Sequence, residues 1–253
     1  MKAQLIDGKR ISAEIKAEAA EEAAALKAKG ITPCLAVVLV GDDSASQVYV
    51  NNKKKACEAV GIRSVSHVLS GGTTEEALLE LIAKLNADKD IHGILVQMPV
   101  PKQIDERKVI LAIDPKKDVD CFHPVNVGNL HTGGEGFLPC TPAGIIELIK
   151  RSGHSIEGKQ CVVIGRSNIV GKPVAMLLMQ ENGTVTICHS RTRNLAEICR
   201  GADIIVSAVG KVNTVTADMV KEGAILIDVG MNRNEAGKLC GDVFTLPTAL
   251  TMI

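Results

Sequence analysis

The chain of 253 residues carries 29 lysines and arginines against 29 aspartates and glutamates, and 46% of its residues are hydrophobic. This length corresponds to one large domain or two ordinary ones, and the apolar fraction excludes an intrinsically disordered chain. The charge is balanced, and the chain has one tyrosine and no tryptophan. We therefore expect neither nucleic acid nor a membrane surface as a partner, because both attract basic patches and nucleic acid also favours aromatic ones.

The start of the chain lacks the apolar stretch of a signal peptide, and the longest aliphatic run, residues 35–40, is far too short to cross a bilayer. Eight cysteines are scattered along the chain without a CxxC pair, which argues against a zinc ribbon. Several lie inside aliphatic runs, where a reduced thiol behaves as a small hydrophobic side chain. These features predict a reducing, cytoplasmic compartment.

The first half of the chain alternates between helical and strand patterns. An Ala/Glu/Lys-rich helix is expected over residues 12–29, ended by Gly30. Strand patterns follow at 34–40, 65–69 and 92–97, and helical patterns at 45–60, 75–86 and 105–112. Thr73 and Glu76 have the spacing of a capping box for the helix at 75–86. Strands that alternate with helices predict a parallel sheet with helices on its faces.

Residues 113–140 break this alternation because Pro, Gly and Asn cluster there, and we place the boundary between two domains, 1–138 and 139–253, in this segment. Thr141 is expected as the N-cap of a helix that runs to about residue 151. The alternation then resumes, with strands at 160–164, 184–188, 203–208 and 224–229, and helices at 171–180, 194–200 and 216–221. The predicted fold class is α/β, with two doubly wound parallel-sheet domains and a cleft between them.

The strongest local signal for a ligand is a strand that ends at Gly165 and is followed by a helix from Gly171. A helix amino terminus offers unpaired N–H groups and a positive dipole, which suit a phosphate. The spacing differs from GxGxxG, so a plain strand–turn–helix stays open as the alternative. The next strand is followed by Ser190 and Arg191 with no carboxylate, and Arg166 lies in the first turn. This favours NADP over NAD, unless these arginines are merely solvated loop charges.

Tyr49 stands four residues before Lys53 on the expected helix at 45–60, on a stripe shared with apolar residues. Lys54 and Lys55 point away from that stripe. Desolvation would lower the pKa of Lys53 and make it usable as an acid or base. The alternative is a solvated lysine whose stem covers apolar surface.

Three further side chains are placed where a ligand would meet a parallel sheet. Gln97 ends the strand at 92–97, and ligands bind beyond the carboxyl ends of such strands. Asp118 and Asp120 lie near the expected domain boundary, a common position for a cleft. Gln97 as a loop residue, and either aspartate as a turn former or helix cap, are the alternatives. His123 and His131 are expected in the junction loop without a second ligand at metal spacing, so no metal site is predicted.

Six stretches in register along residues 1–243 resemble the bifunctional methylenetetrahydrofolate dehydrogenase/methenyltetrahydrofolate cyclohydrolase family. They are residues 40–53, 93–101, 117–130, 139–144, 163–173 and 228–232. The resemblance implies that 5,10-methylenetetrahydrofolate is oxidised with NADP to 5,10-methenyltetrahydrofolate, which is then hydrolysed to 10-formyltetrahydrofolate. It also implies a homodimer, a Rossmann-type second domain, and a role in purine, methionine and histidine biosynthesis.

The resemblance assigns the folate site to Tyr49, Lys53, Gln97 and Asp120. Lys53, held by Gln97, would transfer protons around an attacking water, Tyr49 would pack on the aromatic part of the folate, and Asp120 would accept hydrogen bonds from the pterin. Cofactor contacts are implied for Gly165, Arg166, Ser167, Ser190, Arg191, Gly210 and Met231. No metal is implied.

The end of the chain departs from the family pattern. After residues 241–243 the family usually continues into a Pro-Gly-Gly loop and a terminal helix. In this chain, residues 244–253 have a sequence unlike that pattern. We expect this atypical tail to remove one wall of the cofactor–substrate cleft. Dehydrogenase activity alone and an inactive nucleotide-binding remnant therefore stay as alternatives.

Overall fold

The computed structural model describes residues 4–234, 236–244 and 251–252, and the chain forms two compact units. One unit is Ser12–Leu138, and the other combines the described residues before it with those from Pro139 onward. Helix α1 (Gly8–Ala28) begins in one unit and continues into the other. No helix in the described ranges is both long and apolar enough to cross a membrane. The prediction about the atypical tail falls largely outside the described residues.

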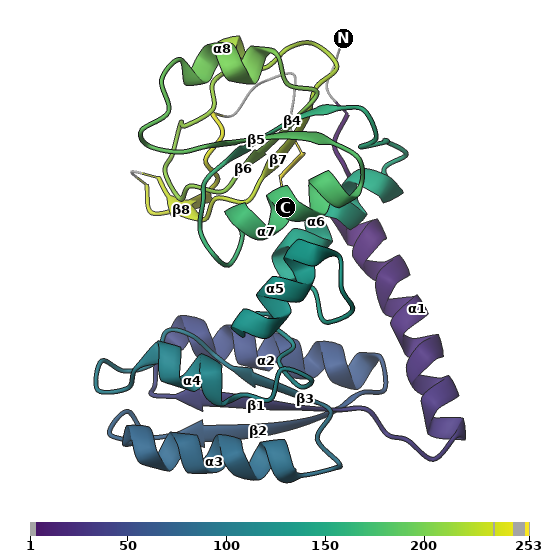
Figure 1. The fold of residues 1–253 in the computed structure, drawn as a ribbon, viewed down its shortest axis with the longest axis vertical. Coiled ribbons are helices and arrows are strands. Elements are labelled where there is room, and N and C mark those ends of the chain that lie inside the picture. Colours follow the sequence, from purple (N-terminus) through teal and green to yellow (C-terminus); the bar gives the residue numbers. More distant parts are fainter. Residues whose placement is uncertain (1–3, 235, 245–250, 253) are drawn as a thin grey trace. The chain divides into compact units, whose positions relative to one another are not determined.

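In the unit Ser12–Leu138, three parallel strands have the order β2-β1-β3. Its strands and main helices are β1 (Cys34–Val40), α2 (Ser44–Ala59), β2 (Arg63–Leu69), α3 (Glu75–Ala87), β3 (Gly93–Val96) and α4 (Glu106–Ala112). Successive side chains of β1 point to opposite faces, so Val38 joins the core under α3 and α4, while Val37 packs with Val50 of α2. Figure 1 shows α2 and α3 on opposite sides of this sheet.

In the unit that includes Pro139 onward, five parallel strands have the order β10-β7-β6-β4-β5. The main elements are α6 (Cys140–Arg151), β4 (Gln160–Ile164), α7 (Gly171–Gln180), β5 (Thr184–Cys188), α8 (Leu195–Arg200), β6 (Ile204–Ser207), β7 (Ile225–Asp228) and β10 (Thr251–Met252). A 3-10 turn, η1 (Ala217–Met219), stands where the sequence predicts a longer helix, and β8 (Asn232–Arg233) pairs with β9 (Leu239–Cys240). The predicted fold class, α/β with two doubly wound parallel sheets, is confirmed.

One helix is absent from the sequence prediction. Helix α5 (Pro124–Thr132) forms inside the segment 113–140, which the composition predicts to be irregular. His123 caps it, because its Nδ1 accepts a hydrogen bond from the backbone N–H of Val125 at 3.2 Å, and Gly133 ends it in the left-handed region with φ 71°. Proline at the start and glycine after the end are ordinary helix signals. Helix α5 was not predicted because it contains several residues of low helix propensity, so its composition resembles that of a loop.

Helix α3 begins at Glu75 as predicted, but the N-cap residues predicted for α3 and α6 are both wrong. Thr74, and not Thr73, is the N-cap of α3, and its Oγ1 accepts a hydrogen bond from the N–H of Ala77 at 3.2 Å. Adjacent threonines offer the same capping oxygen, so the sequence alone does not choose between them. Helix α6 begins at Cys140, which places Thr141 inside the helix instead of at its cap.

All eight cysteines carry free thiols. Cys161 and Cys199 are fully buried, and burial raises the pKa of each to about 11. Both therefore stay protonated near neutral pH and fill the core as small hydrophobic side chains, as the sequence predicts.

Gly165, directly after β4, combines a positive φ of 125° with close packing, since a Cβ there would overlap the carbonyl oxygen of Ala208. We expect Gly165→Ala to lower the free energy of unfolding by about 2–4 kcal/mol, from backbone strain and overlap together. Gly158→Ala is the matched control, because Gly158 has φ 71° but open space around it, and it should cost about 1 kcal/mol. Equal losses for both variants in urea denaturation would show that the contact with Ala208 is unimportant.

Candidate active site

A lysine and a glutamine from different elements meet beside the sheet of the unit Ser12–Leu138. Lys53 Nζ, on α2, donates a hydrogen bond to Gln97 Oε1 at 3.2 Å. The Gln97 amide is itself held, because its Nε2 donates to the carbonyl oxygen of Met98 at 2.8 Å. Since the amide nitrogen is engaged there, the amide oxygen faces Lys53. The side-chain nitrogen of Lys53 is thus oriented toward the Gln97 amide oxygen, which is a neutral acceptor.

The position of Gln97 follows from the strand order. Its backbone N–H donates to Val38 O at 2.8 Å, which ties it to the middle strand at the carboxyl end of β3. Strands β2 and β3 flank β1 on opposite sides, so the chain reverses its direction of winding at β1. In open parallel sheets, such a switch point is where ligands bind. Gln97 therefore lies where this fold class places its ligands, as the sequence predicts.

The three consecutive lysines of α2 have different surroundings. Lys53 is partly buried, whereas Lys54 and Lys55 are exposed, which confirms the predicted orientation of the run. Tyr49 lies one helical turn before Lys53, and 45% of its surface is exposed. The stripe predicted for this helix is thus apolar in part only, and the ring of Tyr49 presents surface that a planar ligand can cover.

Asp118 and Asp120, the two acids near the predicted domain boundary, have different surroundings. Asp118 is only 3% exposed, and its Oδ2 accepts hydrogen bonds from the N–H of His123 at 2.8 Å and from Asn126 Nδ2 at 3.0 Å. Its backbone also forms a bridge with Ile94 of β3. Asp118 therefore anchors the segment that carries Asp120, which matches the structural alternative left open for it.

Asp120 is partly buried, and burial raises the pKa of its carboxyl group. The charge of nearby Lys53 acts in the opposite direction, and the charge of Asp118 adds to the increase. Within the described ranges, no donor of the chain forms a hydrogen bond with the Asp120 side chain. Its oxygens are thus desolvated, close to Lys53, and able to accept hydrogen bonds from a ligand.

The second sheet has a switch point of its own. Strand β4 has β5 on one side and β6 on the other, so the loops after β4 and β6 meet at the carboxyl edge, where Gly165 contacts Ala208. Ser167 closes the turn before α7, because its Oγ accepts hydrogen bonds from the N–H groups of Val170 and Gly171, both at 3.1 Å. This places a short glycine-containing turn before the amino terminus of a ten-residue helix.

The segment that follows β5 carries an exposed arginine. Ser190 and Arg191 are both exposed, and the N–H of Arg191 donates to His189 Nδ1 at 3.1 Å. In the part of the chain that the structure describes, neither Arg166 nor Arg191 forms an ion pair. The β5 end also lacks the carboxylate that would bind ribose hydroxyls. These guanidinium groups therefore suit a phosphate.

Family models match two separate stretches of the chain. A sequence model described as "Tetrahydrofolate dehydrogenase/cyclohydrolase, catalytic domain" matches residues 6–120, and one described as the NAD(P)-binding domain of the same enzymes matches residues 139–249. The chain belongs to the tetrahydrofolate dehydrogenase/cyclohydrolase family. The Lys53–Gln97 pair lies in the part matched by the catalytic-domain model, and the turn after β4 in the part matched by the NAD(P)-binding model.

Relatives extend over most of the chain. It is 61% identical to the Bifunctional protein FolD of Agathobacter rectalis over 241 residues, which are 95% of this chain and 86% of that protein. A crystal structure of the bifunctional enzyme FolD from Campylobacter jejuni has a TM-score of 0.92 and 51% identity, over 95% of this chain and 86% of that one. The Trypanosoma brucei FolD, solved with NADP cofactor and an inhibitor, has a TM-score of 0.89 and 41% identity, over 96% and 86%.

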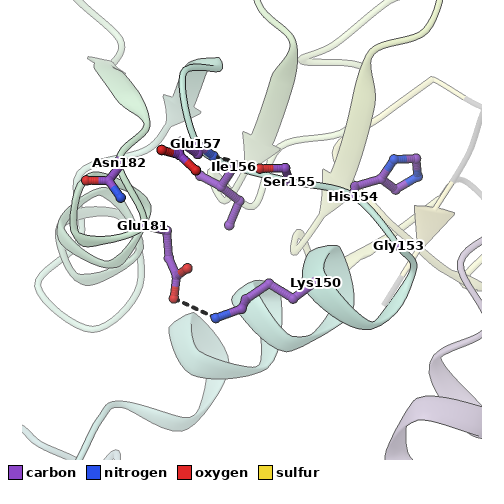
Figure 2. A pocket seen from close by; sticks show the side chains of 8 residues that line it. All are labelled: Lys150, Gly153, His154, Ser155, Ile156, Glu157, Glu181 and Asn182. Atoms are coloured by element: carbon purple, nitrogen blue, oxygen red, sulfur yellow. Dashed lines mark hydrogen bonds and ion pairs between the residues drawn. The ribbon is translucent and has the colours of Figure 1, made fainter.

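A pocket of this family member lies away from every predicted site residue. Figure 2 shows it between the ends of α6 and α7, where Lys150 pairs with Glu181 at 2.9 Å. It is lined by residues that precede β4 and β5: Lys150, Gly153, His154, Ser155, Ile156, Glu157, Glu181 and Asn182. This is the amino edge of the sheet, opposite the edge where doubly wound sheets bind ligands.

Sequence reasoning missed the buried polar residues Asn126 and Asp242. Asn126 Nδ2 donates both to Asp118 and to the carbonyl oxygen of Pro115 at 2.8 Å, and Asp242 has no exposed surface. In the sequence, each is only a polar residue next to apolar ones. That pattern is too common in loops to predict burial. Met231 and Gly210, predicted to contact the cofactor, lie on segments that Asp242 holds.

Proposed function

We propose that this protein oxidises 5,10-methylenetetrahydrofolate with NADP to 5,10-methenyltetrahydrofolate, and then hydrolyses that product to 10-formyltetrahydrofolate. The observation that carries the proposal is the hydrogen bond from Lys53 to Gln97 at a switch point, with desolvated Asp120 nearby. Support also comes from relatives called bifunctional FolD at about 60% identity.

The residues of the second switch point fit NADP. Arg166 and Arg191 are exposed cations without an ion pair among the described residues, and Ser190 adds a hydroxyl group. The amino terminus of α7 adds partial positive charge, which suits a phosphate. When bound here, NADP would supply the hydride acceptor for oxidation of the one-carbon bridge of the folate. Gly165, Ser167, Gly210 and Met231 complete the proposed cofactor site.

In the hydrolytic step, water adds to the cationic methenyl carbon, which is already electrophilic. A new C–O bond forms as the water loses one proton. When the carbon–nitrogen bond breaks, its electron pair stays on nitrogen, which takes up a proton, and the added hydroxyl loses its remaining proton as the formyl C=O forms, so one proton is released overall. Lys53 Nζ, held by Gln97, is the group that we assign to these proton transfers. A positioned acid–base group of this kind contributes typically about 10²–10⁴-fold to a rate.

Two residues orient the substrate in this proposal. The exposed ring of Tyr49 packs on the aromatic part of the folate, one turn of α2 away from Lys53. The Asp120 carboxylate accepts hydrogen bonds from the pterin N–H groups, which replaces the solvation that it lacks. These two contacts would hold the one-carbon unit next to the Lys53 amine.

The family resemblance also supports three broader proposals. We infer a homodimer, a cytoplasmic location, and a role in supplying one-carbon units for purine, methionine and histidine biosynthesis. The homodimer is checked by light scattering of the purified protein, where the mass of one chain, 26.7 kDa, would contradict it.

The proposal is tested by adding 5,10-methylenetetrahydrofolate and NADP or NAD to the purified chain. Reduced nicotinamide and methenyltetrahydrofolate are followed separately by their absorbance. NADP-dependent turnover without accumulation of the methenyl compound supports both activities. One methenyl product per hydride transferred would indicate a dehydrogenase alone. A folded chain that binds NADP without turnover would favour the inactive remnant.

Cofactor preference gives a separate prediction. Arg191→Ala should raise KM for NADP about tenfold, since a hydrogen bond to a charged group is worth about 1.5 kcal/mol. KM for NAD should change little, because NAD lacks the 2′-phosphate. Arg193→Ala is the matched control, as it removes an exposed charge two residues away. An equal rise of KM for both cofactors after Arg191→Ala would contradict phosphate recognition by this residue.

A further inference from the structure

The Asp242 side chain accepts hydrogen bonds from several described residues of its unit. Its side chain has no exposed surface, and each of its two oxygens accepts from more than one donor. Oδ2 accepts from Ser207 Oγ at 3.0 Å, Val209 N at 2.7 Å and Gly210 N at 3.3 Å, and Oδ1 accepts from Lys211 N at 2.8 Å and Asn232 Nδ2 at 2.9 Å. A buried carboxylate needs such compensation for its lost hydration.

Three of these donors are consecutive backbone N–H groups, at residues 209–211. Gly210 has φ 70°, and successive N–H groups in a turn of this kind form a concave anion site. Here the chain's own carboxylate fills that site. The N–H of Gly210 is therefore engaged inside the protein, and any contact of Gly210 with the cofactor must use its other atoms.

Asp242 is itself fixed by a second buried carboxylate. Asp228, at the end of β7, accepts from the backbone N–H groups of Asp242 at 2.9 Å and Gly230 at 3.0 Å with Oδ1, and from Val243 N at 3.0 Å with Oδ2. A Cβ on Gly230 would overlap the Asp242 carboxylate. The position of the Asp242 carboxylate is thus fixed from two sides. Asp228 holds the Asp242 backbone, and the N–H groups of residues 209–211 hold its side chain.

These contacts join the two loops that the cofactor site needs. The loop 209–211 follows β6 at the switch point beside β4, and Asn232 directly follows Met231. We propose that Asp242 is a positioning residue of the cofactor site, which holds the loop 209–211 and the turn 230–232 in the arrangement that binds NADP. This inference rests on the proposed function of that site.

The test variant is Asp242→Asn, which keeps the size of the side chain. An amide has one acceptor oxygen and directs its NH₂ group at N–H donors, so the loop 209–211 loses part of its anchor. We expect the dissociation constant for NADP to rise about tenfold or more, because bonds to a charged acceptor are roughly twice as strong as neutral ones. Cyclohydrolase activity, assayed with methenyltetrahydrofolate and no cofactor, should stay close to that of the unaltered chain.

Asp203→Asn is the matched control. Asp203 also accepts two hydrogen bonds in this unit, from Gln160 N at 2.8 Å and Lys221 Nζ at 2.7 Å, but at the amino edge of the sheet. It should leave NADP binding unchanged. If Asp242→Asn does not fold, Asn232→Ala removes a single donor and should weaken NADP binding about threefold, the effect of one ordinary hydrogen bond.

The outcomes separate this inference from the proposed function. NADP binding by Asp242→Asn as tight as by the unaltered chain would overturn it, and so would equal weakening by Asp203→Asn or a parallel loss of both activities. Where Asp242→Asn does not fold, unchanged binding by Asn232→Ala would overturn it. An unaltered chain that binds NADP without oxidising the folate would instead overturn the proposed function, and the binding comparison would still test Asp242.

Discussion

Lys53→Met should lower the cyclohydrolase rate about 10²–10⁴-fold, the contribution of a positioned acid–base group. Methionine keeps an unbranched side chain but cannot carry a proton, and the hydrogen bond to Gln97 Oε1 is lost. Hydride transfer moves no proton through Lys53, so a measurable part of the dehydrogenase activity should remain. Under NADP-dependent turnover, the methenyl product should then accumulate, and its absorbance would report the separation of the two activities.

The control for this experiment comes from the same run of lysines. Lys54→Met removes an identical charge from an exposed position of α2, next to Lys53 in sequence. It should leave both activities close to those of the unaltered chain. Equal loss of dehydrogenase and cyclohydrolase activity in Lys53→Met would show that this lysine binds or supports the folate without acting in the hydrolytic proton transfers.

The helical and strand patterns of the sequence predicted where Tyr49, Lys53 and Gln97 lie on the fold. A spacing of four residues on a helix places Tyr49 and Lys53 on one side, and the end of a buried strand places Gln97 at the carboxyl edge of the sheet. The contact between Lys53 and Gln97 spans 44 residues of sequence, and no local pattern contains it. The family resemblance predicted this contact, and the structure gives the distance between Lys53 Nζ and Gln97 Oε1. The cleft between the domains stays a prediction.

Residues with purely positional roles could not be predicted in this way. Asp118 and Asp120 are separated by one residue and have the same side chain. Only burial and hydrogen-bond partners distinguish the anchor, Asp118, from Asp120. Asp242 is similar, since its donors come from segments up to 35 residues away. Contacts of this range depend on the folded backbone, which residue spacing does not specify.

Asp120→Asn should lower kcat/KM for the folate substrate about 10²-fold, as expected for a loss of roughly 2–3 kcal/mol when a charged acceptor is replaced. The amide offers one acceptor oxygen and one NH₂ group to pterin N–H donors that need two acceptors. The measurement is steady-state kinetics of both reactions, since both use the same folate site. Unchanged kcat/KM would remove Asp120 from substrate recognition.

The same variant should have the opposite effect on stability. Burial raises the pKa of Asp120 above its value in the unfolded chain, so the folded state holds the proton more tightly. The charged form is therefore a cost to folding that is absent below the unfolded-state pKa and complete once pH exceeds the folded-state pKa. Asp120→Asn should thus raise the free energy of unfolding at pH 7, and the gain should vanish as pH falls below about 4.

Asp118→Asn provides the contrast for that experiment. Asp118 accepts hydrogen bonds from His123 N and Asn126 Nδ2, so its replacement should lower the free energy of unfolding at pH 7. Urea denaturation of both variants between pH 4 and pH 7 measures the two effects together. If Asp120→Asn destabilised the protein as Asp118→Asn does, Asp120 would be a structural acid, and the folate would need another partner. A stabilised but inactive Asp120→Asn would show that the fold tolerates a desolvated carboxylate for the sake of substrate binding.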